Sequence, residues 1–273
     1  ISANAVSTVA YLSQINMAIS ALGGGLAVGA SIKISEAYGE GNFELVKRRV
    51  STLFALCGLL GMAILAILIP VAPQFLRLAN TPKEFIEEGT VYFILELVSL
   101  VIIFFNNVYI AIERARGNSK RILNLNMMVI GIKLSLTAFF VYVLKGGINY
   151  ISIATIVSQL ALLGVAVFYM NAKENVFGFS WKAISFRKSV VAPMIKLSVP
   201  VIVEKMAFSL GKVVVNSMST VYGTLTVGAL GISNNIGGIT TNPQNGFQEG
   251  ASAIISQNLG AGKTDRVVKG FNS

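Results

Sequence analysis

The 273-residue chain is 54% hydrophobic and only 12% charged, about half the charge of an ordinary soluble domain. It has no histidine and a single cysteine, which excludes histidine-based acid–base chemistry, disulfides, and metal sites built on histidine or on cysteine clusters. Its net charge of +10 needs no nucleic-acid partner, because anionic lipid at a membrane surface attracts the same basic residues.

Apolar runs near the ~20 residues that cross a bilayer recur along the chain. We predict spans at about 7–35, 48–71, 88–112, 122–145, 149–171, 196–222 and 226–258, separated by segments rich in Gly, Pro, Asn and Ser. Pro70 and Pro73 are expected to close the second span. The predicted fold class is therefore an all-α polytopic membrane protein with about seven transmembrane helices.

The loops between these spans differ in charge and so predict an orientation. One alternate set contains fifteen basic residues: Lys47, Arg48, Arg49, Arg114, Arg116, Lys120, Arg121, Lys173, Lys182, Arg187, Lys188, Lys196, Lys263, Arg266 and Lys269. The opposite set contains three, Arg77, Lys83 and Lys145. Since basic residues concentrate in cytoplasmic loops, we expect a multi-pass protein of the plasma (inner) membrane with the first set in the cytoplasm.

An internal repeat predicts the domain organisation. Residues 25–48 recur without gaps at 246–269, with nine of the 24 aligned pairs identical. Both copies follow the same kind of helix toward the cytoplasm, which indicates parallel repeats in two six-helix lobes of an intact protein. We assign 1–172 to the amino-terminal lobe (helices two to six), 173–195 to a cytoplasmic linker, and 196–273 to helices seven and eight. On this spacing, one amino-terminal span and about four carboxy-terminal spans would lie outside the chain.

Four of the nine identical pairs in the repeat are glycines, and we interpret these four as packing and turning positions. Gly25 with Gly29, and Gly246 with Gly250, would each allow close helix–helix approach. Gly39 and Gly260 fit a left-handed helix cap, and Gly41 and Gly262 fit tight turns into the next element. The run 260–264 looks like the end of a phosphate-binding loop, but Gln257 stands where that motif needs its first glycine, so we do not expect nucleotide binding.

Intramembrane charges are the candidate functional residues, because a charge in lipid is costly. Glu204 follows Pro200 by four residues, where a proline kink would free a backbone carbonyl beside a carboxylate able to bind a cation or a proton. The alternative is a structural ion pair with Lys205 or Lys212. Glu96 and Glu249 are further candidates for cation or proton coupling. Lys33 is expected to reach the cytoplasmic surface, whereas Lys133 and Lys212 lie near mid-span.

Three segments closely resemble the multidrug and toxic compound extrusion (MATE) family. They are 243–263, with GFQEGAS at 246–252 and SQNLGAGK at 256–263, the RARGNSK run at 114–120, and Pro200 with Glu204. The resemblance extends over essentially the whole chain. It implies two six-helix lobes around a cavity that opens alternately to either side, and export of amphipathic organic cations in exchange for sodium ions or protons.

The resemblance also implies that Glu204 matches the family's acidic residue in this helix and that Asn235 lies on the cavity wall. Asn216, Lys212, Met206 and Phe208 complete the predicted substrate cavity, although polar residues in lipid often join helices and apolar ones often pack. We expect no catalytic residue, no cofactor and no metal other than sodium as a coupling ion, and a monomer. The alternatives are a flippase for lipid-linked saccharides or peptidoglycan precursor, favoured by cavity lysines, and a membrane enzyme acting on lipid phosphates, disfavoured by the missing histidine.

Overall fold

The computed structural model describes residues 3–78, 83–145, 147–172, 175–222 and 224–272, and leaves out the side chains of 3–15 and of some positions between 75 and 272. This part of the chain is helical, without a strand. Its α-helices are α1 (Ala3–Gly39), α2 (Phe43–Leu78), α3 (Lys83–Ala115), α4 (Ser119–Ala138), α5 (Ile148–Met170), α6 (Lys188–Ser219), α7 (Thr224–Gly260) and the short α8 (Thr264–Asn272). A π-helical turn, Phe139–Val143, extends α4, and Trp181–Ala183 and Thr220–Tyr222 form 3₁₀ turns.

The predicted membrane-spanning helices are present. Within the described residues, five helical segments are long and apolar enough to cross a bilayer, at 16–39, 43–74, 89–115, 119–143 and 149–170. The two remaining predicted spans coincide with α6 and α7. The fold is therefore that of an all-α multi-pass membrane protein, as predicted from hydropathy.

Helix α2 corrects one boundary. Pro70 and Pro73, which we expected to close the span, lie inside a helix that continues to Leu78. A proline in a helix removes one hydrogen bond and clashes with the preceding turn, but the freed groups can be satisfied locally within a membrane protein. Proline is thus a weaker stop signal in lipid than in water.

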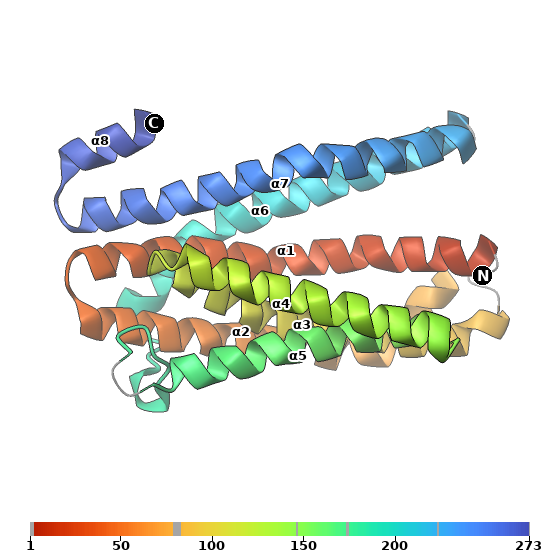
Figure 1. The fold of residues 1–273 in the computed structure, drawn as a ribbon, viewed down its shortest axis with the longest axis horizontal. Coiled ribbons are helices and arrows are strands. Elements are labelled where there is room, and N and C mark those ends of the chain that lie inside the picture. Colours follow the sequence, from red (N-terminus) through yellow and green to blue (C-terminus); the bar gives the residue numbers. More distant parts are fainter. Residues whose placement is uncertain (1–2, 79–82, 146, 173–174, 223, 273) are drawn as a thin grey trace.

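Helix α1 lies at the centre of the arrangement. It packs against α2 and α3 on one side and against α6 and α7 on the other (Figure 1). The core of the first group contains large buried side chains of α2 and α3, such as Leu53, Tyr109 and Ile112. Helices α1 to α5 therefore form a first layer, and α6 and α7 form a second layer that contacts the first mainly through α1.

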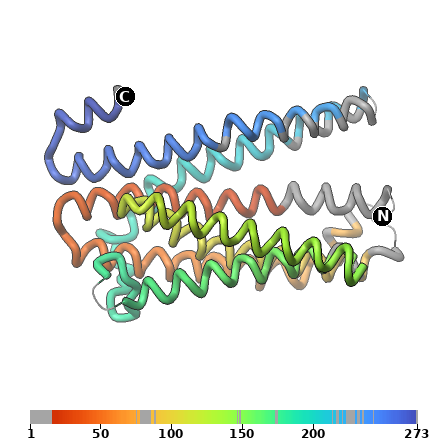
Figure 2. Tube along the Cα trace, viewed as in Figure 1, coloured from red at the N-terminus to blue at the C-terminus, as the bar shows by residue number. Residues whose placement is uncertain are grey.

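Two turns lie at the same end of the molecule, between α1 and α2 and between α7 and α8 (Figure 2). We call this the Gly-x-Gly end and define it by residues 39–42 and 260–263. Gly41 and Gly262 have positive φ, 75° and 69°. In each turn the following amide donates to a carbonyl five residues back, Asn42 to Ala37 at 3.0 Å and Lys263 to Asn258 at 2.9 Å, the hydrogen bond of a Schellman cap.

The left-handed conformation therefore occurs two residues later than we predicted. Gly39 and Gly260 are still helical and lack positive φ, so our interpretation of them as left-handed caps was wrong. Their requirement for glycine comes from helix packing at the site described below.

Candidate functional site

Glycines bring α1 close to α6 and so position the wall of the site. A Cβ on Gly25 would lie 2.6 Å from Ile202, and one on Gly29 would overlap the backbone of Ser198. At this contact the Ser198 hydroxyl donates to the carbonyl oxygen of Leu26 at 3.2 Å. Small residues allow helices in lipid to pack closely. Here they let α6 lie against the half of α1 that is nearer the Gly-x-Gly end. At the equivalent Gly246 and Gly250, an added Cβ would meet no described atom within 4 Å.

A second close contact, between α1 and α7, lies at the Gly-x-Gly end. A Cβ on Gly39 would overlap the carbonyl oxygen of Gln257, and a Cβ on Gly260 would overlap the carbonyl oxygen of Glu36. These two contacts are related by the 221-residue repeat, since residues 36 and 39 correspond to 257 and 260. The side-chain amide of Gln257 also donates to the carbonyl of Ala115 at the end of α3. The repeat thus generates a symmetric crossing of α1 and α7.

A cavity of about 800 Å³ lies between these helices and α3. Its lining comes from four helices: Met17, Ser20, Ala21, Gly24, Ala27 and Val28 on α1, Asn107, Ile110, Ala111 and Arg114 on α3, Glu204, Lys205, Ala207, Phe208, Ser209 and Lys212 on α6, and Thr241, Gln244, Asn245, Gln248 and Glu249 on α7. The volume falls within the ~300–1,000 Å³ typical of small-molecule sites. Apolar, polar and charged side chains all line it, which suits an amphipathic ligand.

Glu204 lies in the cavity wall and is exposed to the cavity. Among the described side chains it forms no ion pair. The two lysines that we considered as structural partners are engaged elsewhere: Lys205 approaches Glu249 at 3.9 Å, and Lys212 lies 4.8 Å from the centroid of the Phe208 ring. The carboxylate of Glu204 is therefore accessible to a ligand from the cavity.

Glu249, unlike Glu204, has cationic partners. Its carboxylate accepts from the Arg114 guanidinium at 2.6 Å, and Lys205 lies at 3.9 Å. The Arg114 and Glu249 side chains are each less than a quarter exposed. This ion pair joins α3 to α7 across one wall of the cavity.

The structure does not place all of the remaining predicted cavity residues in the cavity wall. Lys212 and Phe208 line the cavity, whereas Met206, although described, does not. Met206 lies between two lining positions of the same helix, so its side chain points to another face. The side chains of Asn216 and Asn235 lie outside the described residues.

Glu96 belongs to a separate polar cluster away from the cavity. The Ser152 hydroxyl donates to its carboxylate at 2.7 Å, and the Asn16 amide donates at 3.4 Å. These residues come from α3, α5 and α1. The structure thus separates Glu96 from Glu204 and Glu249.

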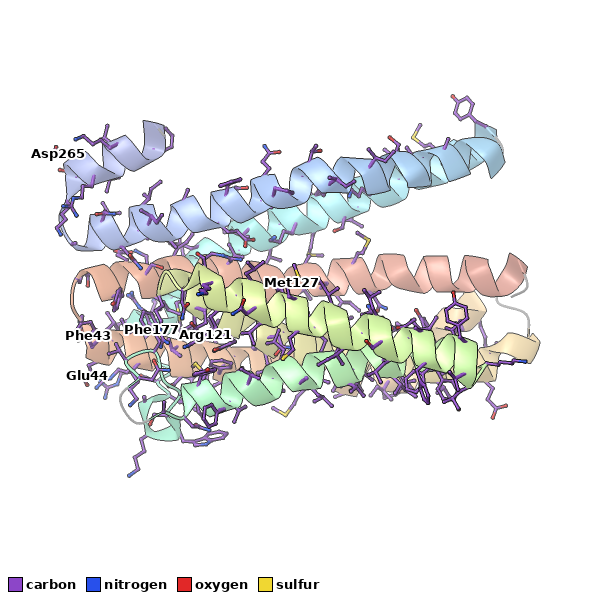
Figure 3. All side chains as sticks on the ribbon, viewed as in Figure 1. Phe43, Glu44, Arg121, Met127, Phe177 and Asp265 are labelled. Carbon is purple, nitrogen blue, oxygen red and sulfur yellow. The ribbon has the colours of Figure 1, made fainter. Side chains whose placement is uncertain are left out.

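Arg114 is a charged cavity residue that we did not assign to the site from the sequence. Close to it in the chain, Arg116 and Arg121 form a compact cluster around the carboxylate of Glu113, which is fully buried. Arg116 and Arg121 each approach that carboxylate at 3.3 Å, and the Arg121 guanidinium lies 3.9 Å from the centroid of the Tyr169 ring. Arg121 lies toward the Gly-x-Gly end, where Phe43 and Glu44 are also found (Figure 3).

No group of three or more acidic or cysteine side chains within the described part of the chain could hold a metal ion. What the site offers is one unpaired carboxylate, one ion pair across the wall and a mixed polar and apolar lining.

A helical membrane protein with a cavity between two packed layers is the class that fold and site define. A protein-family model described as MatE matches residues 1–143 and 200–272, well over half of the chain. The chain belongs to the MatE family.

Two curated relatives come from Bacillus subtilis (strain 168). The probable multidrug resistance protein YoeA is 25% identical over 250 residues, which is 89% of this chain and 54% of that protein. The probable multidrug resistance protein YpnP is 26% identical over 192 residues, 70% of this chain and 43% of that protein. The chain therefore spans about half the length of the curated relatives it matches.

Solved structures share the fold. One is described as the outward-facing conformation of a multidrug resistance MATE family transporter of the MOP superfamily, with TM-score 0.89, 20% identity, and coverage of 100% of this chain and 61% of that chain. Another is a MOP superfamily transporter from Pyrococcus furiosus, whose description reports a binding pocket of reversed polarity, with TM-score 0.88, 20% identity, and coverage of 99% and 60%.

Proposed function

We propose that the chain is part of a secondary antiporter, not an enzyme, that exports amphipathic organic cations in exchange for sodium ions or protons. The observation that carries this proposal is the unpaired carboxylate of Glu204 in the wall of a cavity of about 800 Å³. An organic cation and a coupling ion would compete for that carboxylate. The naming of two relatives as probable multidrug resistance proteins supports the substrate class.

Exchange follows from differential affinity of the two ligands for two conformations. We infer that the α1–α7 crossing, where Gly39 and Gly260 each face a carbonyl oxygen of the other helix, closes the cavity at the Gly-x-Gly end. A ligand that binds one conformation better than the other shifts the population toward it. In this scheme an ion at Glu204 displaces the substrate cation and favours the return of the empty cavity to the opposite side.

We propose further that the protein lies in the plasma (inner) membrane as a monomer, with the Gly-x-Gly end in the cytoplasm. The support is the excess of basic residues in the loops on that side. The cavity would then face outward in this conformation.

Drug efflux by the full-length protein tests the assignment of Glu204. Cells expressing Glu204→Gln should lose most export of a fluorescent amphipathic cation, because the amide keeps the shape and removes the charge. Glu87→Gln, an exposed position outside the cavity, is the matched control and should export normally. Dissipating the sodium gradient and the pH gradient separately would identify the coupling ion. Full export by Glu204→Gln at equal membrane abundance would overturn the assignment.

Glu96→Gln belongs in the same assay, because Glu96 was a candidate coupling residue that lies apart from the cavity. Loss of ion dependence with substrate binding retained would assign it a second coupling role. Normal exchange would leave it as a structural hydrogen-bond acceptor for Ser152 and Asn16.

A flippase for lipid-linked saccharides is the second candidate, and the cations of the cavity favour it. Arg114, Lys205 and Lys212 all line the cavity and could bind a diphosphate. Reconstituted full-length protein distinguishes the two: a flippase would translocate a lipid-linked diphosphate without exporting the organic cation, and Lys205→Gln with Lys212→Gln would abolish that activity.

A further inference from the structure

A second cavity lies on the side of the bundle, away from the central one. Its volume is about 630 Å³, and it lies between α2 and α5 with Phe105 of α3 among its lining residues. Within the described residues no Cα atom of α2 lies within 8 Å of a Cα atom of α5, so the two backbones stand apart and leave a groove between them. We call it the lateral groove and define it by Phe54, Gly58 and Met62 of α2, Ala166 and Met170 of α5, and Trp181.

The lateral groove is apolar and opens to the surface of the membrane-spanning region. Leu59, Met62 and Val167 are half or more exposed along its rim, and all three lie within candidate spans. Such a surface is covered by lipid chains in a bilayer. Its length along α2 also suits one leaflet: Ser51 and Met62 are 11 helical steps apart, or ~16 Å, about half of the ~30 Å hydrocarbon core.

The end of the lateral groove nearest the Gly-x-Gly end is covered by the segment between α5 and α6. This segment is held firmly on α2. The amide of Ser180 donates to the Ser51 hydroxyl at 3.0 Å, and the amide of Ser185 donates to the Thr52 hydroxyl at 3.0 Å. The Phe54 and Phe179 rings meet edge to face at 5.9 Å. The segment that covers the groove is therefore held in place by the fold.

The covering segment carries aromatic and basic side chains in alternation. Trp181 is 81% exposed and Phe186 57% exposed, and both line the groove. Their chain neighbours Lys182, Arg187 and Lys188 are exposed, and among the described residues none of the three has an acidic partner. Aromatic side chains favour the membrane interface, and basic ones there attract anionic headgroups.

We propose that the lateral groove binds an anionic phospholipid of the cytoplasmic leaflet, with one acyl chain along α2 and α5 and the phosphate on Lys182, Arg187 and Lys188. Charge complementarity selects this occupant, because an uncharged lipid would leave three bases unpaired. The leaflet rests on the orientation given with the proposed function, whereas lipid selectivity does not depend on transport.

Fluorescence quenching by lipids with brominated acyl chains tests this proposal, because Trp181 is the single tryptophan of the chain and lines the groove. Full-length protein is placed in nanodiscs containing brominated phosphatidylglycerol or brominated phosphatidylcholine, and Trp181→Phe identifies the signal of Trp181. The expected half-quenching fraction is at least about fivefold lower for phosphatidylglycerol, because a single base near the surface already contributes about 1 kcal/mol.

Substitutions separate the headgroup from the chain. Lys182→Gln, Arg187→Gln and Lys188→Gln together should remove the preference, whereas Lys263→Gln, Arg266→Gln and Lys269→Gln, the same charge loss near α8, should keep it. Gly58→Leu fills the groove and should weaken quenching by phosphatidylglycerol, and its first carbon has room, 3.5 Å from the Phe105 ring. Equal quenching by both lipids, or a preference that survives the first triple substitution, would overturn the proposal.

Discussion

Glu113 shows how one residue stabilises the Gly-x-Gly end of the first layer. Its carboxylate is fully buried, with Arg116 and Arg121 at 3.3 Å. Removing it would leave two guanidinium groups without their shared partner, and breaking a buried pair in this way costs about 3–5 kcal/mol. We expect Glu113→Ala to lower the melting temperature of the purified full-length protein by several degrees.

Glu44 is the matched control at the same end of the molecule. It pairs with Arg48 at 2.6 Å, but its side chain is 76% exposed, and such surface pairs contribute about 0.2–1 kcal/mol. Glu44→Ala should therefore melt close to the wild type. Equal losses for the two variants would show that the Glu113 cluster adds no more than a surface pair.

The acidic residues also show the limit of the sequence as a predictor. The position of Glu204 four residues after Pro200 singled it out in the sequence, and the structure places it in the cavity wall. Nothing in the sequence showed that Glu249 is neutralised, because Arg114 is 135 positions away and on another helix. Pair formation depends on tertiary geometry, whereas hydrophobic run length, a local property, was enough to locate the helices.

At the scale of the helix, the repeat singled out Gly39 and Gly260, but we assigned them the wrong reason. Gly39 and Gly260 are required by the α1–α7 crossing, in which each faces a carbonyl oxygen of the other helix. We expect Gly39→Ala or Gly260→Ala to force the two helices apart at the Gly-x-Gly end, since the added carbon meets rigid backbone.

Thiol labelling would measure that opening. A cysteine in place of Gln248, which lines the cavity, should react with a membrane-impermeant maleimide several times faster from the Gly-x-Gly side in either variant. Gly131→Ala is the control, because a Cβ at Gly131 has no described atom within 4 Å. Unchanged labelling in Gly39→Ala would mean that the crossing does not close the cavity.

At the scale of the whole chain, the described helices form two layers that meet at the Gly-x-Gly end, and the Arg114–Glu249 pair joins them. If this pair favours the closed conformation, Arg114→Gln leaves Glu249 with only the more distant Lys205, Glu249→Gln leaves Arg114 without its carboxylate, and the double variant removes both charges. The effects should then be non-additive, with a coupling of about 0.5–3 kcal/mol as for other contacting pairs. The conformational population is measurable from spin-label distances between positions 44 and 265, which lie on opposite layers at that end (Figure 3). Additive shifts would show that α3 and α7 move independently of the pair, and the α1–α7 crossing would then account for closure alone.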